Sequence, residues 1–265
     1  MADKYHDTVA QSHVTTDDAF VKAEVEKILA RDLEANRTHD VFKFLFNCID
    51  LTTLNATDSP QSVAAFTERV NDFEQQHPDL PNVAAICVYP NFAPIVRTVL
   101  DVTEVNIACV AGGFPSSQTF PEVKVAEVAL AVEGGADEID IVLNVGNFLD
   151  GDWEEVCDEI EELKHSCRDA HLKVILETGA LKTAENVRAA SILAMYSGAD
   201  FIKTSTGFAA GGATVEDVRF LREHISPDVR VKAAGGIRTF EQAQAMIEAG
   251  ADRIGASALA ALAEQ

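Results

Sequence analysis

The stretch Gly198-Ala199-Asp200-Phe201-Ile202-Lys203-Thr204-Ser205-Thr206-Gly207 decides the fold, because it joins the end of a helix to the start of a strand. The Gly-Ala-Asp triplet is typical of a helix C-terminus and the turn that leaves it. Phe201 and Ile202 then predict a buried strand, which places Lys203 in the protein interior. A buried lysine is rare unless it is paired or functional.

The same helix-to-strand junction recurs twice. Gly135-Ala136-Asp137 precedes an apolar run, and Gly250-Ala251-Asp252 precedes Arg253-Ile254-Gly255. The three triplets are separated by 63 and 52 residues. Each interval leaves room for two strand–helix units.

Eight short apolar runs alternate with helical patterns. They cover residues 46–51, 83–89, 105–110, 138–145, 172–177, 201–206, 229–233 and 253–256. Strands that are apolar on both faces and alternate with helices indicate a parallel sheet covered by helices. Eight such units favour an α/β fold of the (β/α)8 TIM-barrel type over an open, doubly wound sheet. We predict an N-terminal helical extension over residues 1–40, with an extra helix near 17–35, and a barrel domain over 41–265.

Composition narrows the classes of function. The net charge of −22 over 265 residues disfavours nucleic-acid binding, because phosphates would be repelled. Acidic residues gather on one predicted helix near 150–162, which indicates a solubilising surface; adaptation to high salt or cold is the alternative. No apolar run is long enough to span a bilayer. A polar N-terminus and five cysteines without a CxxC pair predict a cytoplasmic protein.

The candidate site follows from the position of polar residues on the strands. Barrel enzymes place their active sites at the C-terminal ends of the strands. The polar residues that fall there are Asp50, Asn144, Glu177, Lys203 and Lys232, with Asp140 in mid-strand. One buried acid could merely balance a buried base. Two lysines with two aspartates instead predict an amine nucleophile whose pKa is lowered by a like-charged neighbour.

Glycine-rich turns follow the last two predicted strands, at Gly235-Gly236 and at Gly255-Ala256-Ser257. Many barrels bind phosphate at this place through backbone N–H groups, and glycine lets the backbone approach the anion. A plain turn is the alternative reading.

Metal ions and nucleotide cofactors are not expected. No histidine falls at the C-terminal end of a predicted strand, and no pair has ligand spacing on that face. The sequence contains neither a GxGxxG motif nor a P-loop.

The segment around Lys203 resembles the Schiff-base lysine motif of deoxyribose-phosphate aldolases. The resemblance continues through Asp50-Leu51-Thr52-Thr53-Leu54, Cys87-Val88-Tyr89-Pro90, Gly135-Ala136-Asp137-Glu138-Ile139-Asp140, Glu177-Thr178-Gly179, Lys232-Ala233-Ala234-Gly235-Gly236-Ile237-Arg238 and Arg253-Ile254-Gly255-Ala256-Ser257. It therefore covers roughly residues 45 to 260 in the same order.

The resemblance implies reversible cleavage of 2-deoxy-D-ribose 5-phosphate to acetaldehyde and D-glyceraldehyde 3-phosphate, without a cofactor. It implies that Lys203 is the nucleophile, that Asp140 transfers protons with a water, and that Lys232 shares the relay. The remaining implied residues are Asp50, Thr52, Cys87 and Thr206 for substrate, and Gly207, Gly235, Gly236, Gly255 and Ser257 for phosphate. Members of this family often form dimers, so a homodimer is possible.

Two positions depart from the family pattern. Some relatives carry a lysine at the position of Phe208 and a serine at that of Ala258, and both help to bind phosphate. Their absence predicts weaker phosphate binding and better tolerance of non-phosphorylated aldehydes. Two alternatives stay open: a class I aldolase for another sugar phosphate, and a non-catalytic phosphosugar-binding barrel.

Overall fold

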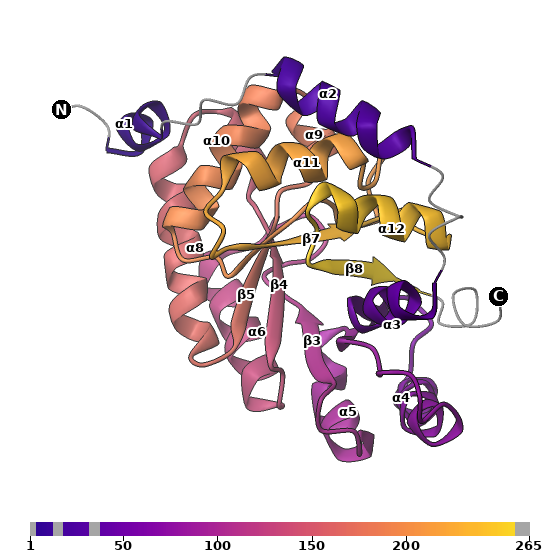
Figure 1. Cartoon of the computed structure of the whole chain (residues 1–265). Helices are drawn as coiled ribbons and strands as arrows, with labels where there is room; N and C mark the ends of the chain where they lie inside the picture. The colour runs from indigo at the N-terminus through magenta and orange to yellow at the C-terminus, as the bar shows by residue number, and fades with distance from the viewer. Residues whose placement is uncertain (1–3, 13–17, 32–37, 258–265) are drawn as a thin grey trace.

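A closed barrel of eight parallel strands lies at the centre of the molecule, with neighbours in the order β1 to β8 (Figure 1). The computed structural model describes residues 4–12, 18–31 and 38–257. The strands are β1 (Ile49–Thr52), β2 (Ala85–Val88), β3 (Asn106–Val110), β4 (Glu138–Val142), β5 (His171–Ile175), β6 (Phe201–Lys203), β7 (Arg230–Ala234) and β8 (Arg253–Ala256). The predicted (β/α)8 fold is confirmed.

Helices surround the barrel. They are α1 (Lys4–Gln11), α2 (Asp18–Leu29), α3 (His39–Asn47), α4 (Pro60–Gln76), the 3-10 helix η2 (Pro90–Phe92), α5 (Ala93–Val99), α6 (Pro121–Glu133), α7 (Val145–Leu149), α8 (Trp153–Cys167), α9 (Thr178–Leu181), α10 (Ala184–Tyr196), α11 (Val215–His224) and α12 (Phe240–Ala249). The two helices before residue 32 lie outside this ring: α1 packs on α8 and α10, and α2 packs on α11 and α12 (Figure 1).

The first strand was predicted to start too early. Phe46 belongs to α3, whose N-terminus is capped by Thr38 through a hydrogen bond from the backbone N–H of Val41. Phe42 and Phe46 are four residues apart and stack on each other at 6.0 Å between ring centroids. This i, i+4 pairing is a helical spacing, and it extends the helix into the run that we predicted as a strand.

Three further strands end two or three residues before their predicted ends. β4 ends at Val142 and α7 begins at Val145, while β5 ends at Ile175 and β6 ends at Lys203. Glu177 has a left-handed backbone (φ 55°) and precedes α9, so it is not part of a strand. The polar residues after these strands therefore lie on loops at the mouth of the barrel.

The repeated Gly-Ala-Asp triplet fixes each strand to its neighbour. The side-chain carboxylates of Asp137, Asp200 and Asp252 accept the backbone N–H of Ile107, Leu172 and Val231, at 2.8, 2.7 and 2.8 Å. The backbone N–H of each aspartate donates to the carbonyl of the same partner residue. The glycine of the triplet is needed at Gly250, where φ is +112° and a Cβ would lie 2.6 Å from the Arg222 side chain. The stretch that predicts the fold thus also holds the barrel closed.

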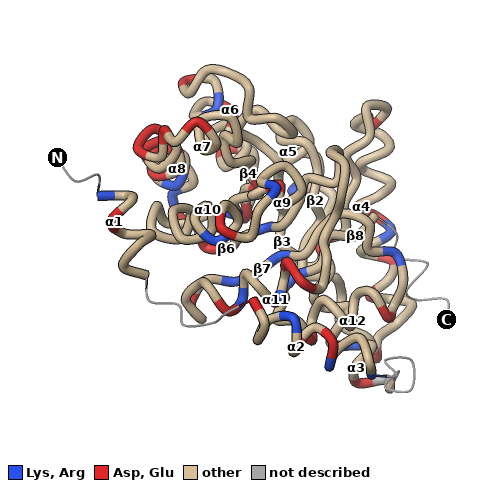
Figure 2. The backbone as a smooth tube through the Cα atoms, turned by 90° about the horizontal axis from the view of Figure 1, so that it is seen from above, with Lys and Arg blue, Asp and Glu red and all other residues tan. Residues whose placement is uncertain are grey.

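The interior of the barrel has an apolar side and a charged side. Ala85, Cys87, Ala108 and Val110 form a separate apolar cluster on β2 and β3. The buried ionic side chains of the barrel interior come from β1, β4, β5, β6 and β7, and the partly buried Arg253 joins them from β8. In the view from above, acidic residues mark α8 while basic residues lie among the strands (Figure 2). No helix in the described part of the chain is long and apolar enough to cross a membrane.

Candidate active site

Lys203 is the last residue of β6, and its side chain is 4% exposed. Its Nζ donates a hydrogen bond to Oδ2 of Asp140 at 2.7 Å. Asp140 is fully buried in the middle of β4, as the alternation of the strand predicted. The structure therefore brings together the two residues that the sequence assigned to nucleophile and proton carrier.

Lys232 completes this arrangement. It lies opposite Lys203 in the register of β6 and β7. Its Nζ contacts Asp140 Oδ2 at 2.8 Å and Asp50 Oδ2 at 2.5 Å. The Nζ atoms of Lys203 and Lys232 thus share one acceptor, Oδ2 of Asp140.

Three further ionic residues belong to this site, and the sequence analysis missed them. Lys173 Nζ lies 2.9 Å from Asp140, 3.3 Å from Asp50 and 2.5 Å from Glu138. Arg253 donates to Asp50 at 2.6 Å and to Glu138 at 3.1 Å. We call the full set the barrel charge cluster: Asp50, Glu138, Asp140, Lys173, Lys203, Lys232 and Arg253.

A signal for the missed residues was present in the sequence. Glu138 is two residues before Asp140, so both must point to the same side of β4. Lys173 follows the same alternation on β5, where Leu172 and Val174 are buried apolar residues. Apart from Asp140, the predicted site residues come from the C-terminal ends of the strands, whereas Glu138, Lys173 and Arg253 lie deeper in the barrel.

The environment shifts the pKa values of Lys203 and Lys232 in opposite directions. Burial lowers the pKa of Lys203 below its ordinary value, Asp140 opposes this effect, and the positive charge of Lys232 adds to it. Burial also disfavours the charged form of Lys232, but Asp140 and Asp50 outweigh it and raise its pKa to about 12. Lys203 is therefore the lysine suited to be a free amine, while Lys232 stays an ammonium. The predicted like-charge effect is present, but burial is the larger cause.

Asp50 is fully enclosed by cations. Both of its oxygens contact basic groups, from Lys173 and Lys232 on one oxygen and Arg253 on the other. In the structure its partners are charges of the barrel, and its role toward substrate hydroxyls stays a prediction. Thr52 lies at the end of β1, where its hydroxyl donates to the carbonyl of Asp50.

The loop after β6 is held at the mouth by Glu177. The Thr206 hydroxyl and its backbone N–H both donate to the Glu177 carboxylate. The Thr206 hydroxyl also accepts the backbone N–H of Phe208 at 3.0 Å. Thr206 is thus a support for the loop around Gly207, and a contact with substrate stays a prediction. Asn144, another predicted polar residue, caps the N-terminus of α7.

The glycines predicted to bind phosphate lie on adjoining loops. Gly207, Gly235 and Gly236 all have positive φ, and a Cβ on Gly235 would lie 3.6 Å from the Cα of Gly207. The N–H groups of Gly235 and Gly236 find no backbone acceptor among the described residues. Such N–H groups suit an anion. Gly255 lies in β8 beside Ala234, and Ser257 follows it as an exposed residue.

Phe208 lies at the entrance to this region and is 54% exposed. Its ring meets that of Phe114, from the loop after β3, edge to face at 5.4 Å between centroids. Phe114 also packs on the apolar cluster of β2 and β3, which includes Cys87. The mouth therefore has an apolar wall opposite the lysines. Ala258 lies outside the described residues.

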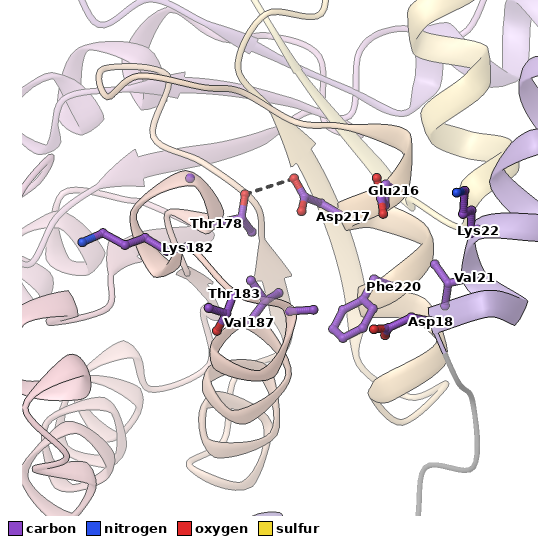
Figure 3. A pocket seen from close by; sticks show the side chains of 12 residues that line it. Asp18, Val21, Lys22, Thr178, Lys182, Thr183, Val187, Glu216, Asp217 and Phe220 are labelled. Atoms are coloured by element: carbon purple, nitrogen blue, oxygen red, sulfur yellow. Dashed lines mark hydrogen bonds between the residues drawn. The ribbon is translucent and has the colours of Figure 1, made fainter.

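A cavity of about 400 Å³ lies outside the barrel, between α2, α10 and α11 (Figure 3). Val187 and Phe220 line it, and Thr178 donates to Asp217 at its edge. Lys203 is not among its lining residues. The chemistry of the lysines is thus separate from this cavity. In the described residues, no group of three or more His, Cys, Asp or Glu side chains is arranged to hold a metal ion.

Comparisons with known proteins identify the family of the chain. The family model described as DeoC/LacD family aldolase matches residues 44–263. The deoxyribose-phosphate aldolase of Exiguobacterium sibiricum is 41% identical over 214 residues, which is 81% of this chain and 93% of that protein. The corresponding aldolase of Thermococcus gammatolerans is 50% identical over 177 residues, covering 65% and 78% of the two chains. The tetrameric deoxyribose phosphate aldolase structure from Aeropyrum pernix superposes with a TM-score of 0.74 at 26% identity, covering 91% and 95%.

Proposed function

The chain belongs to the DeoC/LacD family of aldolases, and we propose that within it Lys203 is the amine that attacks the substrate. The activity that follows is that of the relatives named deoxyribose-phosphate aldolase, namely cleavage of 2-deoxy-D-ribose 5-phosphate to acetaldehyde and D-glyceraldehyde 3-phosphate. One observation carries the assignment of the residue. Lys203, which is buried at the mouth and has a lowered pKa, shares the acceptor Oδ2 of Asp140 with the ammonium of Lys232.

The reaction follows from this arrangement. The neutral amine of Lys203 adds to the aldehyde carbon of the open-chain sugar, and loss of water gives an imine. Removal of the proton from the 3-hydroxyl breaks the bond between C2 and C3, and the electron pair moves into an enamine. Glyceraldehyde 3-phosphate leaves, C2 of the enamine gains a proton, and water releases acetaldehyde from Lys203.

Asp140 is placed to carry the protons in these steps. Its carboxylate is 2.7 Å from Lys203 Nζ, so it can hold the proton that the amine loses or gains. Its pKa lies well below the ordinary value because Lys173, Lys203 and Lys232 surround it and together outweigh its burial. A strongly acidic group is a weak base, so a water between Asp140 and the substrate would take part. Lys232 is an ammonium that also contacts Asp140, so it can donate a proton in this relay and adds a positive charge beside Lys203.

Trapping of the imine tests the assignment. We expect sodium borohydride, added with acetaldehyde, to attach an ethyl group to Lys203 and to inactivate the enzyme. Peptide mass analysis locates the adduct. Lys203→Met should abolish trapping and reduce turnover on the order of 10⁵-fold or more, because no other amine replaces the nucleophile. An adduct on another lysine would contradict the assignment, and trapping of a ketone donor in place of acetaldehyde would favour an aldolase for another sugar phosphate.

The selectivity of the mouth is a further prediction. Phe208→Lys should raise the ratio of kcat/KM for deoxyribose 5-phosphate over deoxyribose about tenfold, because a hydrogen bond to a charged group contributes roughly 1.5–3 kcal/mol. Steady-state kinetics with both sugars measures the ratio. Phe208→Met, which loses the ring contact with Phe114 but adds no charge, is the matched control and should leave the ratio near that of the parent. Equal ratios in both variants would show that phosphate does not reach this position.

A further inference from the structure

The barrel charge cluster contains one more cation than carboxylates. Lys173 contacts three carboxylates, and Lys232 and Arg253 contact two each. Within the described ranges 4–12, 18–31 and 38–257, Lys203 makes an ion pair with Asp140 alone. The four cations face three carboxylates: Asp50, Glu138 and Asp140. The net charge of the cluster is therefore zero when one of the four basic groups is neutral. Lys203 contacts the fewest carboxylates, so its charged form is the least stabilised.

Burial makes this balance matter. The three carboxylates and the three lysines are at most 4% exposed, and the side chain of Arg253 is 13% exposed. A net charge in such an interior costs much more free energy than one at the surface. The cluster therefore loses a proton from the lysine whose charged form is stabilised by the fewest carboxylates. Arginine does not release its proton in a protein.

Other ionisable groups near the cluster leave this count unchanged. Cys87 faces it from β2, and burial raises the pKa of its thiol, so it stays neutral. Arg230 lies over the Phe201 ring at 3.9 Å and makes no ion pair with the cluster among the described residues. Glu177 binds Thr206 on the loop after β6. The charges that face Lys203 are thus those of the cluster itself.

We propose that Glu138 and Arg253 are positioning residues that set the protonation of Lys203, although neither contacts it: the positive charge of Arg253 favours the neutral amine, and the negative charge of Glu138 limits this effect. The positive charges of Arg253, Lys173 and Lys232 already neutralise the three carboxylates. No negative charge of the cluster is then left over to stabilise an ammonium at Lys203. This inference rests on the proposed function, in which Lys203 is the attacking amine. It gives the deeper part of the barrel a role in the reaction at its mouth.

The pH dependence of trapping tests the proposal. The rate at which acetaldehyde and cyanoborohydride modify Lys203 falls at low pH because the amine is protonated. Glu138→Gln removes one negative charge and disfavours the protonated amine further, so this fall should move about one pH unit downward. Below the midpoint, trapping should then be about tenfold faster than in the parent enzyme. Asp50→Asn removes another carboxylate that does not touch Lys203 and should move the profile in the same direction, which provides a second test if Glu138→Gln does not fold.

Two controls separate charge from a change in packing. Asn106 donates to Glu138 at 2.8 Å, so Asn106→Ala disturbs the same carboxylate without changing its charge and should leave the profile in place. The double variant Glu138→Gln with Arg253→Gln removes one charge of each sign and should return the profile to that of the parent. An unchanged profile in both carboxylate variants, or an equal shift in Asn106→Ala, would overturn the proposal. Absence of trapping on Lys203 in the parent enzyme would instead refute the proposed function.

Discussion

Replacing Lys232 with leucine should move the acid limb of imine trapping about two pH units upward. A like charge within a few ångströms shifts a pKa by about 1–3 units. Lys232 shares Asp140 Oδ2 with Lys203, and without it that oxygen holds the Lys203 ammonium alone. The free amine then becomes the minor form at neutral pH, and the rate of trapping should fall on the order of 100-fold there. The pH profile of acetaldehyde trapping measures this shift.

A control variant separates the charge of Lys232 from the packing of its side chain. Lys232→Arg keeps a positive charge at nearly the same place, so its profile should stay close to that of the parent enzyme. At high pH, where Lys203 is neutral in either case, Lys232→Leu should recover much of the trapping rate. A profile that does not move would mean that burial alone lowers the pKa of Lys203, since burial is the larger of the two causes.

The sequence predicted the fold well because the same local pattern is repeated along the chain. Each Gly-Ala-Asp triplet marks a helix end and a strand start, and the aspartate then bonds to the preceding strand. Errors appear where a helical spacing runs into an apolar stretch, as at Phe42 and Phe46. The division into an extension over 1–40 and a barrel over 41–265 stays a prediction.

The site was predictable only in part, because sequence shows which face a side chain takes but not which residues meet. Lys203, Lys232 and Asp140 could be placed together by strand order and alternation. Lys173 reaches Asp50 across the barrel, 123 positions away in the sequence, and such a contact requires the closed structure. The ring contact of Phe114 with Phe208 likewise joins loops from β3 and β6. No local pattern reports which loops meet over the mouth.

Loss of a buried ion pair outside the site should cost the largest amount of stability. Lys124 on α6 is fully buried, and its Nζ lies 2.6 Å from Glu159 on α8 and 2.8 Å from the hydroxyl of Ser117. Lys124→Met leaves the Glu159 carboxylate buried without its cation. Removing one partner of a buried pair costs about 3–5 kcal/mol of the free energy of unfolding. Since 1 kcal/mol shifts Tm by about 2–4 °C in a chain of this size, we expect Tm to fall by about 10 °C. Thermal and urea unfolding measure the change.

The double variant decides whether this pair stabilises the protein or is only costly to break. Lys124→Met with Glu159→Leu removes both charges and fills the space with apolar atoms, and such replacements are often neutral or stabilising. We expect its Tm to return to near that of the parent enzyme. Ser117 keeps a left-handed backbone (φ 60°) on the loop that carries Phe114, so the lost contact with its hydroxyl should show in the ratio of kcat/KM for phosphorylated over non-phosphorylated sugar. A double variant that is as unstable as Lys124→Met would mean that the contact of Lys124 with Ser117, and not the ion pair, holds this loop.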